Sequence, residues 1–215
     1  MNLSYSSVVS WIKQNWKLAV ISECICLVLV GGYLMIAPRI YEADFSIRLP
    51  KMQVANVNDP AKLEWKLMLS GLEFMRGLQN PLTFSNDFIQ ACMGEDSNAN
   101  RKKFINSMQL GLLNHADIIH FSLRIEGRDK VIRCANLLEK RVLEDLDGVY
   151  EAQILKSKTG SAGSGNVFEK AVLSDSLRVS DSYIKPQIDK AILAALIAGL
   201  FIAIFVVKLR SKYRA

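Results

Sequence analysis

The sequence predicts an α+β membrane protein in which two transmembrane helices flank one α/β domain. Two long runs, 18–37 and 191–207, are almost wholly apolar; Glu23 is the only charge in the first, and the second has none. At 1.5 Å per residue, helices over these runs are about 30 and about 26 Å long, which matches the hydrocarbon core of a bilayer. Between them, residues 38–190 mix strand-like and helix-like patterns.

A cleaved signal peptide is the alternative for the first run, because Lys13 and Lys17 precede it. The run exceeds the apolar core of a signal peptide, which has roughly 7–15 residues. The small residue at its end, Ala37, is followed by Pro38, which disfavours cleavage there. We therefore expect an uncleaved membrane anchor.

Basic residues on both flanks predict the orientation in the membrane. Residues 1–17 include two lysines and no acid, and residues 208–215 include four basic residues and no acid. Such flanks are retained in the cytoplasm. We therefore expect a protein of the bacterial inner membrane with two cytoplasmic termini and with residues 38–190 in the periplasm.

The net charge of the chain does not point to nucleic acid. The formal charge is +6, but once the two basic flanks and Glu23 are set aside, the domain of residues 38–190 is left with +1. A nearly neutral domain lacks the basic surface that phosphate backbones require. The charge pattern indicates the lipid bilayer as a partner and no nucleic acid.

The first half of the domain begins with a predicted strand. Apolar and polar residues alternate over 41–49, and Pro50 ends the pattern. Residues 51–59 are expected to form a loop. Asp59-Pro60 has the form of a helix N-cap and first turn, which predicts a helix reaching residue 78.

Shorter elements follow that helix. Asn80-Pro81 interrupts the helical pattern, and Ser85 is expected to cap a short helix toward Met93. Residues 94–100 read as a loop. Residues 101–113 fit either a helix or a strand, and the spacing leaves both open.

The second half predicts a strand and helix pair. Residues 119–125 alternate as a strand, and residues 129–155 repeat apolar positions with helical spacing. The Gly, Ser and Lys-rich stretch 156–166 predicts a flexible loop. Residues 172–179 are expected to add a strand to the sheet.

The four cysteines divide between the two environments. Cys24 and Cys26 lie in the first apolar run, whereas Cys92 and Cys134 lie in the domain that is expected to face an oxidising compartment. A Cys92–Cys134 disulfide and two free core thiols are both compatible with the sequence.

No enzymatic chemistry is visible in the sequence. The glycines at 160, 163 and 165 lie in the flexible stretch and lack the strand, helix and lysine of a phosphate-binding loop. The cysteines and histidines lack the spacing of metal ligands. We therefore expect a non-enzymatic protein with no catalytic residues, no cofactor and no metal.

Small residues recur at every fourth position in the second apolar run, at Ala191, Ala195, Gly199 and Ala203. They form one stripe along a helix, where backbones can approach closely and associate in lipid. This stripe is a candidate packing face for a homo-oligomer. The alternative is that it reflects only the abundance of Ala and Gly in membrane helices.

Glu23 is the second candidate within the membrane. A charged side chain inside a span is costly unless it is paired, protonated or hydrated. It is expected either to make a polar contact with a neighbouring helix, such as one of a partner polymerase, or to extend to the cytoplasmic interface.

Three segments resemble the chain-length determinant proteins, or polysaccharide co-polymerases, of bacterial surface-polysaccharide assembly. The first is PRIYEA immediately after the first span, the second is the strand and helix pair over 118–146, and the third is Lys185-Pro186 before the second span. The residues that carry the family-like pattern at the two membrane junctions are Pro38, Tyr41, Glu42, Ala43 and Pro186.

This resemblance implies ring-like homo-oligomers that act on a membrane polysaccharide polymerase. The implied function is a non-enzymatic scaffold that regulates the length of O-antigen, capsule or exopolysaccharide. The family's tall helical stalk is expected to be missing, because the flexible stretch 156–166 stands where that helix would continue. The alternative is a structural subunit of an envelope export or secretion complex with the same two-span frame.

Overall fold

The computed structural model describes residues 5–55, 59, 62–114, 117–159 and 167–213. The chain divides into two units. One is a helical unit built from both chain ends, residues 1–39 and 184–215, and the other is an α/β unit of residues 40–183. The predicted α+β class is confirmed, and each unit is described below by itself.

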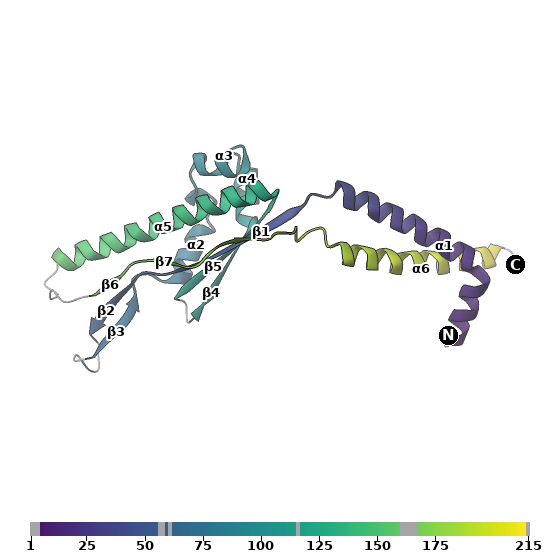
Figure 1. The fold of residues 1–215 in the computed structure, drawn as a ribbon, viewed down its shortest axis with the longest axis horizontal. Helices are drawn as coiled ribbons and strands as arrows, with labels where there is room; N and C mark the ends of the chain where they lie inside the picture. Colours follow the sequence, from purple (N-terminus) through teal and green to yellow (C-terminus); the bar gives the residue numbers. More distant parts are fainter. Residues whose placement is uncertain (1–4, 56–58, 60–61, 115–116, 160–166, 214–215) are drawn as a thin grey trace. The chain divides into compact units, whose positions relative to one another are not determined.

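The helical unit consists of α1 (Tyr5–Ile36) and α6 (Ile188–Tyr213), which pack alongside each other in opposite directions (Figure 1). The segments Trp16–Ile36 and Ile188–Leu209 have mean hydropathies of 2.2 and 2.8. Both are long and apolar enough to cross a membrane, as the sequence predicted.

Four antiparallel strands form the main sheet of the α/β unit, in the order β4-β5-β1-β7. Their bounds are β1 Ile40–Arg48, β4 Met108–Leu113, β5 Ile118–Glu126 and β7 Val172–Val179. The strands predicted over 41–49, 119–125 and 172–179 are therefore confirmed. The register places Phe45 opposite Phe121, and their rings stack with centroids 4.6 Å apart.

One face of this sheet is covered by α5 (Arg128–Thr159), which confirms the predicted strand and helix pair (Figure 1). Gly127 makes the tight turn between β5 and α5 with φ of +87°, a conformation that favours glycine. Apolar residues of the main sheet and of α5 pack together in one core. Its fully buried members from α5 are Val131, Cys134, Ala135, Leu138, Val142 and Leu146.

Short helices with capped N-termini contribute further side chains to this core. They are α2 (Gly71–Leu78), the 3₁₀ turn η1 (Pro81–Thr83), α3 (Asn86–Met93) and α4 (Asn98–Ser107). Each N-terminus is capped by a side-chain oxygen, and the predicted cap is confirmed because Ser85 Oγ accepts from the Phe88 N–H at 3.3 Å. The stretch 101–113, which the sequence left open, is a helix to Ser107 and then strand β4.

A second sheet, ordered β3-β2-β6, corrects two expectations. Its strands are β2 (Lys51–Ala55), β3 (Leu63–Leu67) and β6 (Phe168–Glu169). The loop expected over 51–59 is thus partly a strand, and the helix expected from Asp59-Pro60 begins only at Gly71; Pro60 itself lies outside the described residues. Leu63 and Leu67 are four apart, a helical spacing, but Leu63 and Trp65 are 60% and 48% exposed, so no buried face marks this segment.

Helix α5 extends further than expected. It reaches Thr159, so the first four residues of the predicted loop are helical, while 160–166 lie outside the described residues. Leu146 is its last buried residue, and from there the helix continues for roughly 20 Å at 1.5 Å per residue. A helical extension beyond the core is therefore present, and Tyr150 on it packs edge-on against Phe168 of β6 at 6.4 Å.

Candidate functional site

The stripe of small residues in α6 packs against α1 of the same chain. Ala195 and Ala203 are only 4% and 1% exposed, and Gly199 is buried between them. The hydroxyl of Ser22 in α1 donates to the carbonyl oxygen of Gly199 at 2.8 Å. Within this chain, Ala195, Gly199 and Ala203 therefore form a helix-packing face, while Ala191 is half-buried.

Glu23 lies at the point of closest approach between the two helices. A Cβ atom added at Gly199 would come within 2.5 Å of Glu23 Oε2 and 2.7 Å of its carboxyl carbon. Among the residues that the structure describes, the buried Oε2 atom has no hydrogen-bond partner. Of the two interpretations left open by the sequence, the structure places Glu23 against a neighbouring helix, and that helix belongs to its own chain.

The residues that carry the family-like pattern lie near the junctions of the two units and take several roles. Pro38 precedes β1, and Pro186 follows a cis peptide bond shortly before α6. Ala43 is fully buried in the core and Tyr41 packs against that core. Glu42 points to the opposite face of the sheet, where it belongs to a polar groove.

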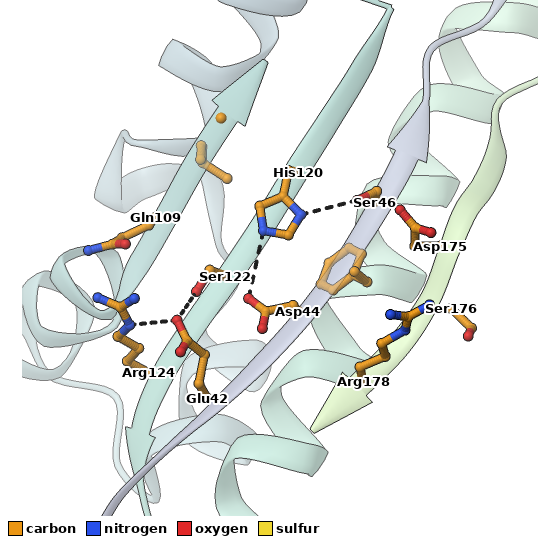
Figure 2. A pocket seen from close by; sticks show the side chains of 13 residues that line it. Glu42, Asp44, Ser46, Gln109, His120, Ser122, Arg124, Asp175, Ser176 and Arg178 are labelled. Carbon is orange, nitrogen blue, oxygen red and sulfur yellow. Dashed lines mark hydrogen bonds and ion pairs between the residues drawn. The ribbon is translucent and has the colours of Figure 1, made fainter. Parts of the chain in front are cut away.

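The polar groove lies on the face of the main sheet that α5 leaves open (Figure 2). It encloses about 630 Å³, and all four strands contribute to it. Because successive residues of a strand point to opposite faces, the polar residues that alternate with the core residues gather here. Its polar lining consists of Glu42, Asp44, Ser46, Gln109, His120, Ser122, Arg124, Asp175, Ser176 and Arg178.

Glu42 is the centre of one half of the groove. Its Oε1 atom accepts from Ser122 Oγ at 2.6 Å and from Arg124 Nε at 2.7 Å, as Figure 2 shows. Burial raises the pKa of this carboxyl group, but the hydrogen bonds from Ser122 and Arg124 and the charge of Arg124 outweigh burial, and the net pKa is lowered. Glu42 is thus a fixed, ionised acceptor at neutral pH.

His120 occupies the middle of the groove between Ser46 and Asp44. Its Nδ1 lies 3.1 Å from Ser46 Oγ, and its Nε2 lies 3.8 Å from Asp44 Oδ1 (Figure 2). These are the residue types of a hydrolytic triad, but Ser46 is only 1% exposed and a substrate carbonyl cannot reach it. The 3.8 Å separation is also longer than a hydrogen bond. The arrangement holds the imidazole in place rather than activating a nucleophile.

The two edge strands of the groove, β4 and β7, carry polar groups that have no partner among the described residues. Within the described ranges, no hydrogen bond or ion pair engages the side chains of Gln109, Asp175, Ser176 or Arg178. They bring two carboxylate oxygens, an amide, a hydroxyl and a guanidinium to the edge of a concave surface. Such unsatisfied donors and acceptors can bind a polar ligand without breaking contacts within the protein.

Of the groove residues, the sequence pointed only to Glu42, and it did so because Glu42 belongs to the family-like pattern after the first apolar run. The period-2 pattern showed which residues share a strand face, but it did not show that β5 lies beside β1 or in which register. Glu42 and Arg124 meet because they are paired residues in that register. In the part of the chain that the structure describes, no group of three or more His, Cys, Asp or Glu side chains is placed to hold a metal ion.

The two cysteines of the domain are both buried in the core, in α3 and α5. Cys92 is 1% exposed and Cys134 is fully buried, and both are free thiols in this structure. The hydrogen bond with the Cys134 thiol, followed by burial, raises the pKa of Cys92 well above its usual value. Of the two states that the sequence left open, the structure contains the thiol pair.

No protein-family model matches this chain, and no curated protein matches it.

Proposed function

We propose that this protein is a non-enzymatic, oligomeric scaffold of the bacterial inner membrane that regulates the chain length of a surface polysaccharide. The observation that carries the proposal is the way in which the chain joins its two units. Only residues 37–39 separate α1 from β1, and only residues 180–187 separate β7 from α6. β1 and β7 are neighbouring strands, so both apolar helices are connected to adjacent strands of one sheet.

The exposed surface of the helical unit supports insertion into a bilayer. Large apolar side chains cover its outside: Met35 is 90% exposed, Ile36 is 86% exposed and Phe201 is 68% exposed. In water such a surface would be unfavourable, whereas lipid tails solvate it. The acid-free basic flanks then favour cytoplasmic termini and a periplasmic domain.

Cysteine labelling tests this topology. The introduced cysteine is Glu151→Cys, on the exposed side of α5, in a chain whose Cys24 is replaced by serine. A membrane-impermeant maleimide added to spheroplasts is expected to label position 151. Labelling that requires permeabilisation of the inner membrane would place the domain in the cytoplasm and exclude the proposal.

A deletion strain tests the function directly. A scaffold that biases a polymerase changes how far chains grow, while the bond-forming chemistry belongs to the polymerase. Deletion of this protein is therefore expected to broaden or shift the length distribution of one surface polysaccharide without abolishing its synthesis. Gel analysis of polysaccharide from deletion and complemented strains measures this.

Two other outcomes would contradict the proposal. Identical length distributions in the two strains would remove length regulation as the function. Complete loss of surface polymer, together with co-purification with an exporter, would indicate a structural subunit of an export complex instead.

A further inference from the structure

We infer that the polar groove on the open face of the main sheet is a binding site for a hydroxyl-rich oligosaccharide segment. The inference deepens the proposed function and rests on it for the identity of the glycan. The groove is a property of the α/β unit alone, so its binding can be measured separately from any effect on chain length.

The size and composition of the groove suit a ligand bound by hydrogen bonds. Its volume of about 630 Å³ is within the range of roughly 300–1,000 Å³ that small-molecule sites occupy. Phe45, Leu110 and Gly111 also line it, but Phe45 is 1% exposed, and no exposed large apolar side chain of the described residues belongs to the lining. This composition favours a ligand that forms hydrogen bonds over one that buries large apolar groups.

The charges of the groove select against strongly charged ligands. Three carboxylates, from Glu42, Asp44 and Asp175, stand against the guanidinium groups of Arg124 and Arg178. The groove thus holds both donors and acceptors, and these five groups sum to a formal charge of −1. Sugar hydroxyls both donate and accept, so an oligosaccharide can complement such a surface, whereas a polyanion meets the carboxylates.

The groove is also organised before a ligand arrives. The Glu42 carboxylate is held by Ser122 and Arg124, and the His120 ring is held by Ser46. Groups that are already fixed lose little conformational freedom on binding. Gln109 and Arg178, on opposite edge strands, have no partner among the described residues and remain available to the ligand.

Binding to the full chain in lipid nanodiscs tests the inference. The probe is the set of oligosaccharides released by mild acid from the surface polysaccharide of the strain that carries this protein, measured by isothermal titration calorimetry. Wild type is expected to bind saturably, and Gln109→Ala and Arg178→Ala are each expected to weaken binding by about tenfold or more. The matched controls, Gln90→Ala and Arg133→Ala, remove the same exposed residue types from α3 and α5 and are expected to bind as wild type.

Three results would overturn the inference. They are no saturable binding by wild type, equal effects of groove and control variants, and a change in subunit number in the groove variants with unchanged binding, which would make this face a contact between copies. Failure of the proposed function gives a different result from failure of the groove inference. A deletion strain with unaltered polysaccharide lengths refutes length control even if the purified chain binds the glycan, and altered lengths without binding refute only the groove.

Discussion

The carboxylate of Glu23 in α1 lies directly against the backbone of Gly199 in α6, in a space that only a glycine leaves open. A Cβ at position 199 would meet Glu23 Oε2 at 2.5 Å, closer than real side chains approach. A glutamate and a glycine that are far apart in the sequence thus meet where the two apolar helices pack against each other.

Gly199→Ala is expected to displace the Glu23 carboxyl group, because the atoms in the way of the added methyl group are the far end of a flexible side chain that can rotate aside. The expected change in unfolding free energy is within about 1 kcal/mol, since the higher helix propensity of alanine offsets the strain. Gly199→Leu is too large to be accommodated in this way and is expected to destabilise the helix pair by about 1–3 kcal/mol, the usual cost of overpacking. Thermal unfolding of the full chain in detergent measures both, with Gly32→Leu as the control, because no atom outside its own helix lies within 4 Å of a Cβ there. Equal losses for Gly199→Leu and Gly32→Leu would mean that close packing at Gly199 contributes nothing.

Glu42 predicts a pH dependence with a definite sign. Its pKa in the folded domain is lowered from its ordinary value of 4.5, so its stabilising contribution is present above pH 4.5 and is lost as pH falls through the lower folded value. Glu42→Gln is expected to flatten the fall in unfolding free energy over that acidic range. Urea unfolding at a series of pH values measures it, with Glu151→Gln, an exposed position on α5, as the control that keeps the wild-type slope.

Arg101 is expected to be the most sensitive cation of the domain. It is 8% exposed, donates to the Phe84 carbonyl oxygen at 2.6 Å and pairs with Asp96 Oδ1 at 2.7 Å. Arg101→Met would leave these acceptors unpaired and is expected to cost about 3 kcal/mol of unfolding free energy. The exposed neighbour Lys102→Met is expected to change it by less than about 0.5 kcal/mol. Equal effects in chemical unfolding would show that the buried contacts of Arg101 contribute nothing.

The thiols of Cys92 and Cys134 are expected to be unreactive while the domain is folded. Both side chains are buried, so a reagent in solution cannot reach them. The hydrogen bond with the Cys134 thiol, followed by burial, also raises the pKa of Cys92 and so disfavours its thiolate, which is the reactive form. Mass spectrometry after N-ethylmaleimide treatment should find both unmodified in native buffer and both modified in denaturant without reductant. Modification that appears only after reduction would instead identify a disulfide.

The elements whose sequence patterns were clearest, β1, β5 and α5, each have one buried face. In β1 and β5 the core side is apolar and the open side is polar, so period-2 alternation is clear, and α5 repeats buried residues with helical spacing. β2 and β3 lack a buried face, and the four-residue spacing of Leu63 and Leu67 imitates a helix. Their strand character depends on pairing with each other, which local pattern does not reveal.

The groove was not predictable for a related reason. Each of its strands has a polar side that, taken alone, is ordinary solvent-facing surface. Its geometry arises from the strand order β4-β5-β1-β7 and from registers such as Ser46 opposite His120. Likewise, the small-residue stripe of α6 predicted close packing, but not that the partner helix is α1.

The antiparallel pairing of β1 and β7 has a mechanical consequence. The start of β1 and the end of β7 lie at the same end of the strand pair, where the Ser180 N–H donates to the Glu42 carbonyl oxygen at 2.8 Å and Ser180 Oγ accepts from the Glu42 N–H at 3.0 Å. A force that draws α1 and α6 apart would act first on this end of the β1 and β7 pair. The hydrogen bonds between the two strands would then break one after another. Load on α1 and α6 would therefore open the sheet at Glu42, the residue that also organises the groove.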